Sequence, residues 1–156
     1  MLKKRLIACL LIKNGLIVQS IGFKKYLPVG NPKFPLEFVV KWDVDEIVLL
    51  DMSASPEKRI LDIKLLEVLS KSCFVPLTVG GGIRNVEDVR KLIRAGADKV
   101  SINSSAIDNP KLITEIADIF GSQCAVVSMD CKLDADGIYR VYKNSGKQET
   151  KLVAAQ

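Results

Sequence analysis

The chain has 156 residues, of which 48% are hydrophobic and 26% are charged, as is typical of a soluble globular domain with a hydrophobic core. The net charge of +5 is spread along the whole length, without a basic block, so we expect no nucleic-acid partner. The chain has no histidine, which excludes histidine-based acid–base catalysis and removes the commonest zinc ligand. We therefore expect no metal and no cofactor.

Apolar runs and cysteines indicate a cytoplasmic protein. No apolar run approaches the ~18 residues that a membrane span needs, and the N-terminal MLKKRLIACLLI lacks a small-residue cleavage site. The four cysteines show no C-x-x-C spacing, which favours reduced thiols over disulfides. They are Cys9, Cys73, Cys124 and Cys131.

Five short runs are apolar on both faces, as is typical of parallel strands buried under helices. They span residues 6–12, 46–50, 73–79, 99–103 and 124–129. Segments with apolar residues at i, i+3 and i+4 lie between them and predict four helices. These helices span residues 36–43, 57–72, 86–96 and 109–121.

Helix-boundary residues agree with this order of alternating strands and helices. Asn85 is an N-cap, Pro56 and Pro110 stand near helix starts, and Gly96 and Gly121 follow helix ends.

The pattern changes after the fifth strand. The alternating I-Y-R-V-Y lies between D-G and S-G, which predicts a small hairpin at about 132–147, and the final KLVAAQ predicts the first turn of a helix. We expect a single domain over residues 1–156.

The charges at the strand beginnings favour a barrel over an open, doubly wound α/β sheet. Side chains alternate along a strand, so Arg5, Glu46 and Lys99 fall on the same face as later polar positions. Charges under helices would be severely penalised, whereas strands that converge on an axis let these three side chains pair. We predict an α/β fold of the (β/α)₈ TIM-barrel class. Because such a barrel needs about 250 residues, we expect only its first five strands and four helices, ending at Gln156.

Barrel active sites lie at the carboxyl ends of the strands, where this chain carries two groups of candidate residues. The first is an anion site: the glycines of VGGGIRN and the S-I-N-S-S run offer backbone N–H groups at Gly82, Asn103 and Ser104. A phosphate-bearing ligand and a plain tight turn both fit the glycines.

The second group is carboxylates. Asp130 ends a buried strand and is a candidate for proton transfer, with a helix cap or a salt bridge as the alternative. Asp51 ends the second strand in the same way, as a secondary candidate or a turn former. The charges of Arg5, Glu46 and Lys99 would by default plug the barrel base.

Several stretches resemble one enzyme family. RLIACLLIKNG, DEIVLLDMSASPEKR, PLTVGGGIRNVEDV, GADKVSINSSAIDNPKLI and FGSQCAVVSMD are similar to the cyclase subunit of imidazole glycerol phosphate synthase, the HisF family. The resemblance runs nearly colinearly from residue 1 to about 150. It implies a (β/α)₈ barrel that receives ammonia from a glutaminase subunit. It also implies a ring-closing lyase reaction on a bis-phosphorylated ribosyl-aminoimidazole carboxamide in histidine biosynthesis.

The resemblance also implies residue roles. Asp130 corresponds to the general acid, and Gly82, Asn103 and Ser104 correspond to one phosphate site. Arg5, Glu46 and Lys99 correspond to the gate through which ammonia enters, and Asp98 to a position that faces the glutaminase, a HisH-like partner in a heterodimer.

Two positions depart from the family. Leu11 stands where the family has its second catalytic aspartate, and Gln19 stands where it has a lysine. A leucine cannot exchange a proton, so full cyclase activity is not implied. With a leucine at position 11, the sequence also resembles a paralogous branch of the family, which supplies ammonia for amidating surface-polysaccharide (O-antigen) sugars. An inert, truncated barrel is the third interpretation.

Overall fold

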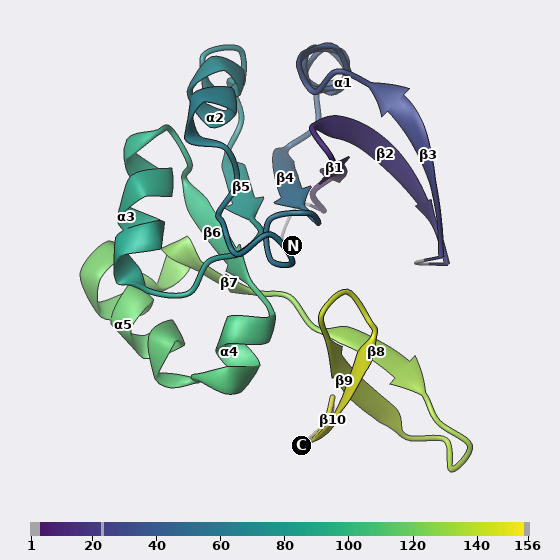
Figure 1. Ribbon diagram of the computed structural model, residues 1–156. Coiled ribbons are helices and arrows are strands. Elements are labelled where there is room, and N and C mark those ends of the chain that lie inside the picture. The colour runs from purple at the N-terminus through teal and green to yellow at the C-terminus, as the bar shows by residue number, and fades with distance from the viewer. Residues whose placement is uncertain (1–3, 23, 155–156) are drawn as a thin grey trace.

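Five adjacent parallel strands make up most of a seven-stranded sheet (Figure 1). The computed structural model describes residues 4–22 and 24–154. The parallel strands are β1 (Ile7–Lys13), β4 (Glu46–Asp51), β5 (Leu77–Gly80), β6 (Lys99–Ile102) and β7 (Ala125–Val127). Each pairs in parallel with the next, in the order β1-β4-β5-β6-β7. The predicted α/β fold with alternating strands and helices is confirmed.

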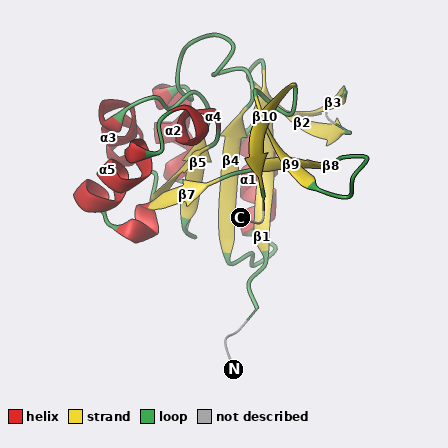
Figure 2. Cartoon of the chain, turned by 90° about the horizontal axis from the view of Figure 1, so that it is seen from below, coloured by secondary structure: helices red, strands yellow, loops and turns green. Residues whose placement is uncertain are grey.

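The sheet buries one face under helices and leaves the other face more open. In β4, Ile47 and Leu49 are fully buried in the hydrophobic core, whereas Val48 and Leu50 are only partly buried. Successive strand residues point to opposite faces, so Glu46, Val48 and Leu50 share the face that lacks helices. Figure 2 shows the helices gathered outside the strands. We call the helix-free side the inner face.

Five helices connect or follow the strands. They are α1 (Lys33–Val40), α2 (Ile63–Ser70), α3 (Val86–Arg94), α4 (Ser104–Asp108) and α5 (Lys111–Phe120), with a 3₁₀ turn at Ser122–Cys124. Asn85 caps α3 as predicted: its side chain accepts a hydrogen bond from the backbone N–H of Asp88 at 2.9 Å. Gly121 ends α5 with a positive φ of 94°. The short α4 begins at Ser104, where the S-I-N-S-S run suggested a helix start, although no separate helix was predicted for it.

The start of α2 differs from the prediction. The apolar periodicity suggested a helix from residue 57, but α2 begins at Ile63. The Asp62 side chain accepts hydrogen bonds from the backbone N–H groups of Lys64 and Leu65, which makes it the N-cap. Pro56 lies in a run of turns instead of at a helix start. The predicted strand from residue 73 likewise begins only at Leu77.

An antiparallel hairpin follows β1 and was missed in the sequence. Strands β2 (Leu16–Ile21) and β3 (Lys25–Gly30) extend the sheet beyond β1. Asn14 and Gly15 form the tight turn with φ values of 50° and 78°, the left-handed values that an Asn-Gly hairpin requires. The K-N-G turn was recognised, but the half-polar strands after it do not have the doubly apolar composition of the parallel ones.

The segment after β7 forms a separate three-stranded antiparallel sheet. Its strands are β8 (Asp130–Leu133), β9 (Tyr139–Lys143) and β10 (Gln148–Val153). The sequence suggested a two-stranded hairpin at about 132–147. The prediction of a helical turn in KLVAAQ is wrong for its described part, because Lys151 to Val153 belong to β10. Ala155 and Gln156 lie outside the described residues.

The parallel sheet curves around its inner face. Lys99 at the start of β6 contacts Glu46 at the start of β4 with an Nζ–Oε2 distance of 2.6 Å, although β5 lies between these strands. Strands separated by one neighbour are about 10 Å apart, so the two long side chains reach toward each other across β5 on the inner face. Within the described residues β3 and β7 have one neighbour each, so the structure is a partial barrel.

None of the described helices is long and apolar enough to cross a membrane. The four cysteines are all free thiols.

Candidate functional site

The fold brings the predicted phosphate and acid residues to one edge of the sheet. Gly82 follows β5, Asn103 and Ser104 follow β6, and Asp130 follows β7. These three strands are adjacent and parallel, so their carboxyl ends meet at the same edge. We call these four residues the strand-end site.

The turn at Gly81 and Gly82 requires glycine at both positions. Their φ values are 122° and 70°, and a Cβ atom on Gly82 would collide with the carbonyl oxygen of Arg59. A Cβ atom on Gly81 would collide with the carbonyl oxygen of Asp51. The glycines are thus required by the close packing of this turn against the backbone of Asp51 and Arg59.

The beginning of α3 does not contribute free amide groups in the way the sequence suggested. The N–H of Asp88 donates to Asn85, and the N–H of Arg84 donates to the buried carboxylate of Asp88 at 3.1 Å. Protein groups therefore already satisfy these donors. An anion here would depend on the Gly81–Gly82 backbone and on the residues after β6.

Asp130 lies in an environment suited to proton transfer. Burial raises the pKa of its carboxyl group, while hydrogen bonds from the Asn103 side chain and the Gly146 backbone act in the opposite direction. The buried Oδ1 atom of Asn103 has no hydrogen-bond partner among the described residues. The site therefore combines a carboxyl group inclined to keep its proton with an unused acceptor, a pairing typical of a ligand site.

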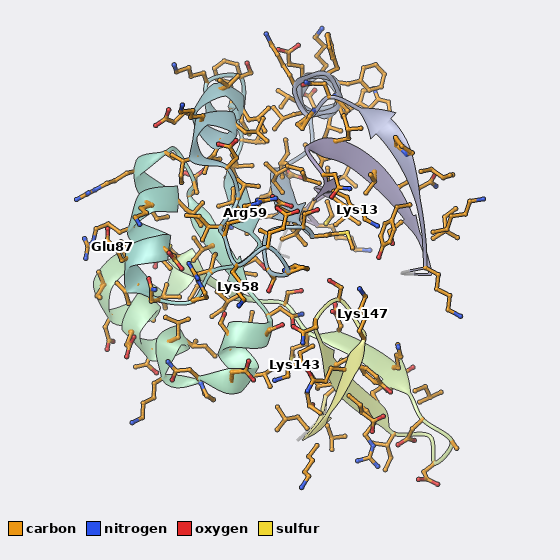
Figure 3. The ribbon with its side chains drawn as sticks, in the orientation of Figure 1. Lys13, Lys58, Arg59, Glu87, Lys143 and Lys147 are labelled. Atoms are coloured by element: carbon orange, nitrogen blue, oxygen red, sulfur yellow. The ribbon has the colours of Figure 1, made fainter. Side chains whose placement is uncertain are left out.

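The turn between β9 and β10 closes onto this site, which the sequence did not reveal. Asn144, Ser145 and Gly146 have successive φ values of 57°, 57° and 71°. The N–H of Asn144 donates to Oγ of Ser104 at 3.2 Å, and Gly146 contacts Asp130. Lys143 also pairs with Asp108 of α4 at 2.6 Å (Figure 3). The S-G pair signalled a turn, but no local pattern indicates which distant residues a turn contacts.

At the opposite end of the strands, three charged residues form one cluster. Glu46 is 6% exposed and accepts from Nη1 of Arg5 at 2.7 Å and from Nζ of Lys99 at 2.6 Å. The hydrogen bond from Lys99 is the main reason why the pKa of Glu46 is lowered. The predicted pairing of these residues is thus observed, and we call them the basal charge cluster.

The remaining predicted positions are not members of the two clusters. Asp98 is exposed before β6, and its Oδ2 accepts from the N–H of Leu77 at 2.8 Å. Leu11 is half-buried near the end of β1, opposite Leu50 of β4. Gln19 is exposed in the missed strand β2, opposite Leu27.

Asp51 is not free for catalysis. Its buried carboxylate pairs with Nη1 of Arg59 at 2.6 Å and accepts from the N–H of Ser53 at 2.9 Å. Residues 4–22 and 24–154 hold no group of three or more His, Cys, Asp or Glu side chains that could bind a metal ion.

Residues 5–156 match the sequence model of a family described as "Histidine biosynthesis protein". The chain belongs to this family. Its relatives include several HisF proteins. HisF of Exiguobacterium sp. is 46% identical over 156 residues, which are 100% of this chain and 61% of that protein. HisF of Alkaliphilus metalliredigens is 46% identical over 154 residues, 99% of this chain and 61% of that protein.

A Vibrio vulnificus protein is a further relative in the family, provisionally named imidazole glycerol phosphate synthase subunit hisF2. It is 51% identical over 142 residues, 91% of this chain and 52% of that protein. The chain thus spans between 52% and 61% of the length of these relatives. The similarity to HisF proteins confirms the resemblance seen in the sequence.

Proposed function

We propose that this chain carries the acid and one phosphate site of a cyclase-type imidazole glycerol phosphate synthase subunit. The observation that carries the proposal is the meeting of Gly82, Asn103, Ser104 and Asp130 at the ends of three adjacent strands in a HisF-family chain. The substrate is a bis-phosphorylated ribosyl-aminoimidazole carboxamide, of which this site holds one phosphate group. The reaction is ammonia-dependent ring closure with lyase chemistry, in the cytoplasm.

The phosphate group binds through short-range donors. The turn at Gly81 and Gly82 supplies backbone N–H groups, and the Ser104 hydroxyl group lies one strand away. The Asn103 side chain donates a hydrogen bond to Asp130 and so orients the acid beside the phosphate site.

Asp130 acts as the general acid. Its raised pKa favours the protonated form, which an acid needs before it can donate a proton to a leaving group. The second carboxylate of a two-carboxylate mechanism is missing, because Leu11 cannot accept a proton. We therefore expect the ring-closing reaction to be slow, whereas the affinity for the phosphate group should not be affected by Leu11.

The basal charge cluster forms the ammonia entrance. Arg5, Glu46 and Lys99 lie at the strand beginnings, and Asn103 lies four residues beyond Lys99, about 13 Å at the usual rise of a strand. Asp98, exposed beside Lys99, contacts a glutaminase subunit that releases ammonia at this end.

The test is turnover of the bis-phosphorylated substrate with ammonium salts. We expect that Leu11→Asp raises the rate and that adding Asp130→Asn to it lowers the rate by at least about 10²-fold, the usual contribution of a general acid. A Leu11→Asp chain without detectable turnover that still binds the substrate would contradict the cyclase proposal. A chain that binds nothing phosphorylated would be the inert barrel.

A second function is favoured by Leu11 and Gln19, which stand where the family has an aspartate and a lysine. In this alternative the chain passes glutamine-derived ammonia to an enzyme that amidates a surface-polysaccharide sugar. The ion pairs of the basal charge cluster are intact, whereas the carboxyl end of β1 carries Leu11 in place of the family's aspartate. This combination fits a protein that still conducts ammonia but delivers it to a different reaction.

The conduit is tested with Lys99→Ala in the presence of a glutaminase partner. Loss of the Lys99 contact to Glu46 should lower product formation from glutamine and leave product formation from free ammonium unchanged. Equal glutamine-dependent rates in both chains would contradict an entrance at this cluster.

A further inference from the structure

The loop between β4 and α2, residues 52–62, forms the wall against which the glycine turn packs. The carbonyl oxygen of Arg59 occupies the space beside Gly82, and a Cβ atom on Gly82 would also lie 3.2 Å from the carbonyl carbon of Ala54. The position of the Arg59 backbone therefore limits where Gly82 can lie.

The Arg59 side chain holds this backbone in place. Its Nη1 atom donates to Asp51 at 2.6 Å and to the carbonyl oxygen of Ile60 at 3.1 Å, and its Nε atom pairs with Glu57 at 2.6 Å. The N–H of Arg59 donates to the carbonyl oxygen of Ala54 at 3.0 Å. Figure 3 shows Arg59 on this loop, beside Lys58. One guanidinium group thus connects the end of β4 to Glu57 and Ile60 within the loop.

The anchor for Arg59 is rigid. Asp51 is 5% exposed at the end of β4, and its backbone carbonyl lies against Gly81. The buried carboxylate has Ser53 and Arg59 as hydrogen-bond donors, so it keeps its place only while the arginine neutralises it. A chain of contacts therefore runs from the end of β4 through Asp51 and Arg59 to the glycine turn.

We propose that Arg59, held by Asp51, is a positioning residue for the phosphate site: its ion pair sets the backbone geometry of Gly81 and Gly82. This inference rests on the proposed function, which assigns a phosphate group to that turn. Arg59 does not itself contact the phosphate; it acts through the packing of its own carbonyl group against Gly82.

The test is a titration of the isotope-labelled full chain with inorganic phosphate, followed by NMR at the Gly81 and Gly82 amide groups. Arg59→Ala should shift both signals before phosphate is added and weaken phosphate binding about tenfold, the equivalent of one lost anion contact. Arg59→Lys, which keeps a charge beside Asp51, should bind within about threefold of the unaltered chain.

The matched control is Arg140→Ala. Arg140 pairs with Asp134 at 2.8 Å in the three-stranded sheet and is exposed to a similar degree, 30% against 37% for the Arg59 side chain. This variant loses an ion pair of the same kind and should bind phosphate like the unaltered chain.

Four results would overturn the inference. The first is Arg59→Ala binding as tightly as the unaltered chain with unmoved glycine signals, and the second is equal weakening by Arg140→Ala. If Arg59→Ala does not fold, the third is equal phosphate affinity of Arg59→Gln and Arg59→Lys, because only the lysine keeps the charge. The fourth is an unaltered chain whose glycine signals do not respond to phosphate, which would remove the proposed phosphate site itself and this inference with it.

Discussion

Glu46 is the residue on which the base of the partial barrel depends most. It is buried and pairs with two cations, Arg5 from the segment before β1 and Lys99 from β6. Glu46→Gln leaves these cations close together without a countercharge. Because both are partly exposed, we expect a loss of about 2 kcal/mol of unfolding free energy, below the range for fully buried pairs.

Urea unfolding measures this loss. The control is Glu87→Gln, which removes an exposed pair with Arg90 at 3.5 Å and should change the free energy by at most about 0.5 kcal/mol. Equal effects of the two variants would contradict the structural importance of the cluster.

The lowered pKa of Glu46 makes its contribution depend on pH. Folding favours the charged form, so the stabilisation is complete above the ordinary pKa of 4.5 and is lost as pH falls through the lowered pKa. The difference in unfolding free energy between the unaltered chain and Glu46→Gln should shrink in acid. A difference that stays constant from neutral to strongly acidic pH would contradict this assignment.

Asp130 should show the opposite sign. Burial raises its pKa above the ordinary 3.8, so folding favours the neutral form and the ionised group destabilises the fold at neutral pH. Asp130→Asn should therefore be more stable than the unaltered chain at neutral pH in thermal unfolding, and the gap should close as pH falls. A less stable Asp130→Asn at neutral pH would mean that the hydrogen bonds from Asn103 and Gly146 outweigh burial.

The elements that sequence patterns predicted are those with strong local signals. The doubly apolar strands and the Asn85 cap depend on neighbouring residues, and the structure has all five strands and the cap, although β5 begins four residues later than expected. The hairpin of β2 and β3 was missed because its strands are half polar and lie at the sheet edge. The apolar spacing before Asp62 looks helical, but Pro56 and the ion pair of Arg59 hold that segment in turns.

The glycine turn after β5 offers an element-scale test of packing. Gly82→Ala places a side chain at a left-handed φ of 70° and brings its Cβ atom into collision with the Arg59 carbonyl group. We therefore expect a loss of about 3 kcal/mol or more of unfolding free energy. Gly137 has a φ of 77° and open space around its Cβ position. Gly137→Ala should thus lose only the conformational part, about 1 kcal/mol. Similar losses in urea unfolding would contradict the tight contact.

At the scale of the whole molecule, one inner face carries a different group of residues at each end. Strand β6 connects the two groups: it begins with Lys99 of the basal charge cluster and is followed by Asn103 of the strand-end site. Strand alternation predicted the pairing of Arg5, Glu46 and Lys99, because like faces of curved strands converge. Strand alternation could not predict that the Asn144–Gly146 turn contacts Ser104 and Asp130. Those contacts depend on how the separate three-stranded sheet lies against the parallel sheet.

The most direct test of the account is calorimetric titration of the chain with the bis-phosphorylated aminoimidazole substrate. We predict saturable binding at one site, weakened about tenfold by Ser104→Ala, because one donor to the phosphate is lost. Lys143→Ala, which removes the nearby pair with Asp108, should weaken it far less. Absence of saturable binding, or equal affinity of the Ser104→Ala chain, would contradict a phosphate site at the ends of β5, β6 and β7.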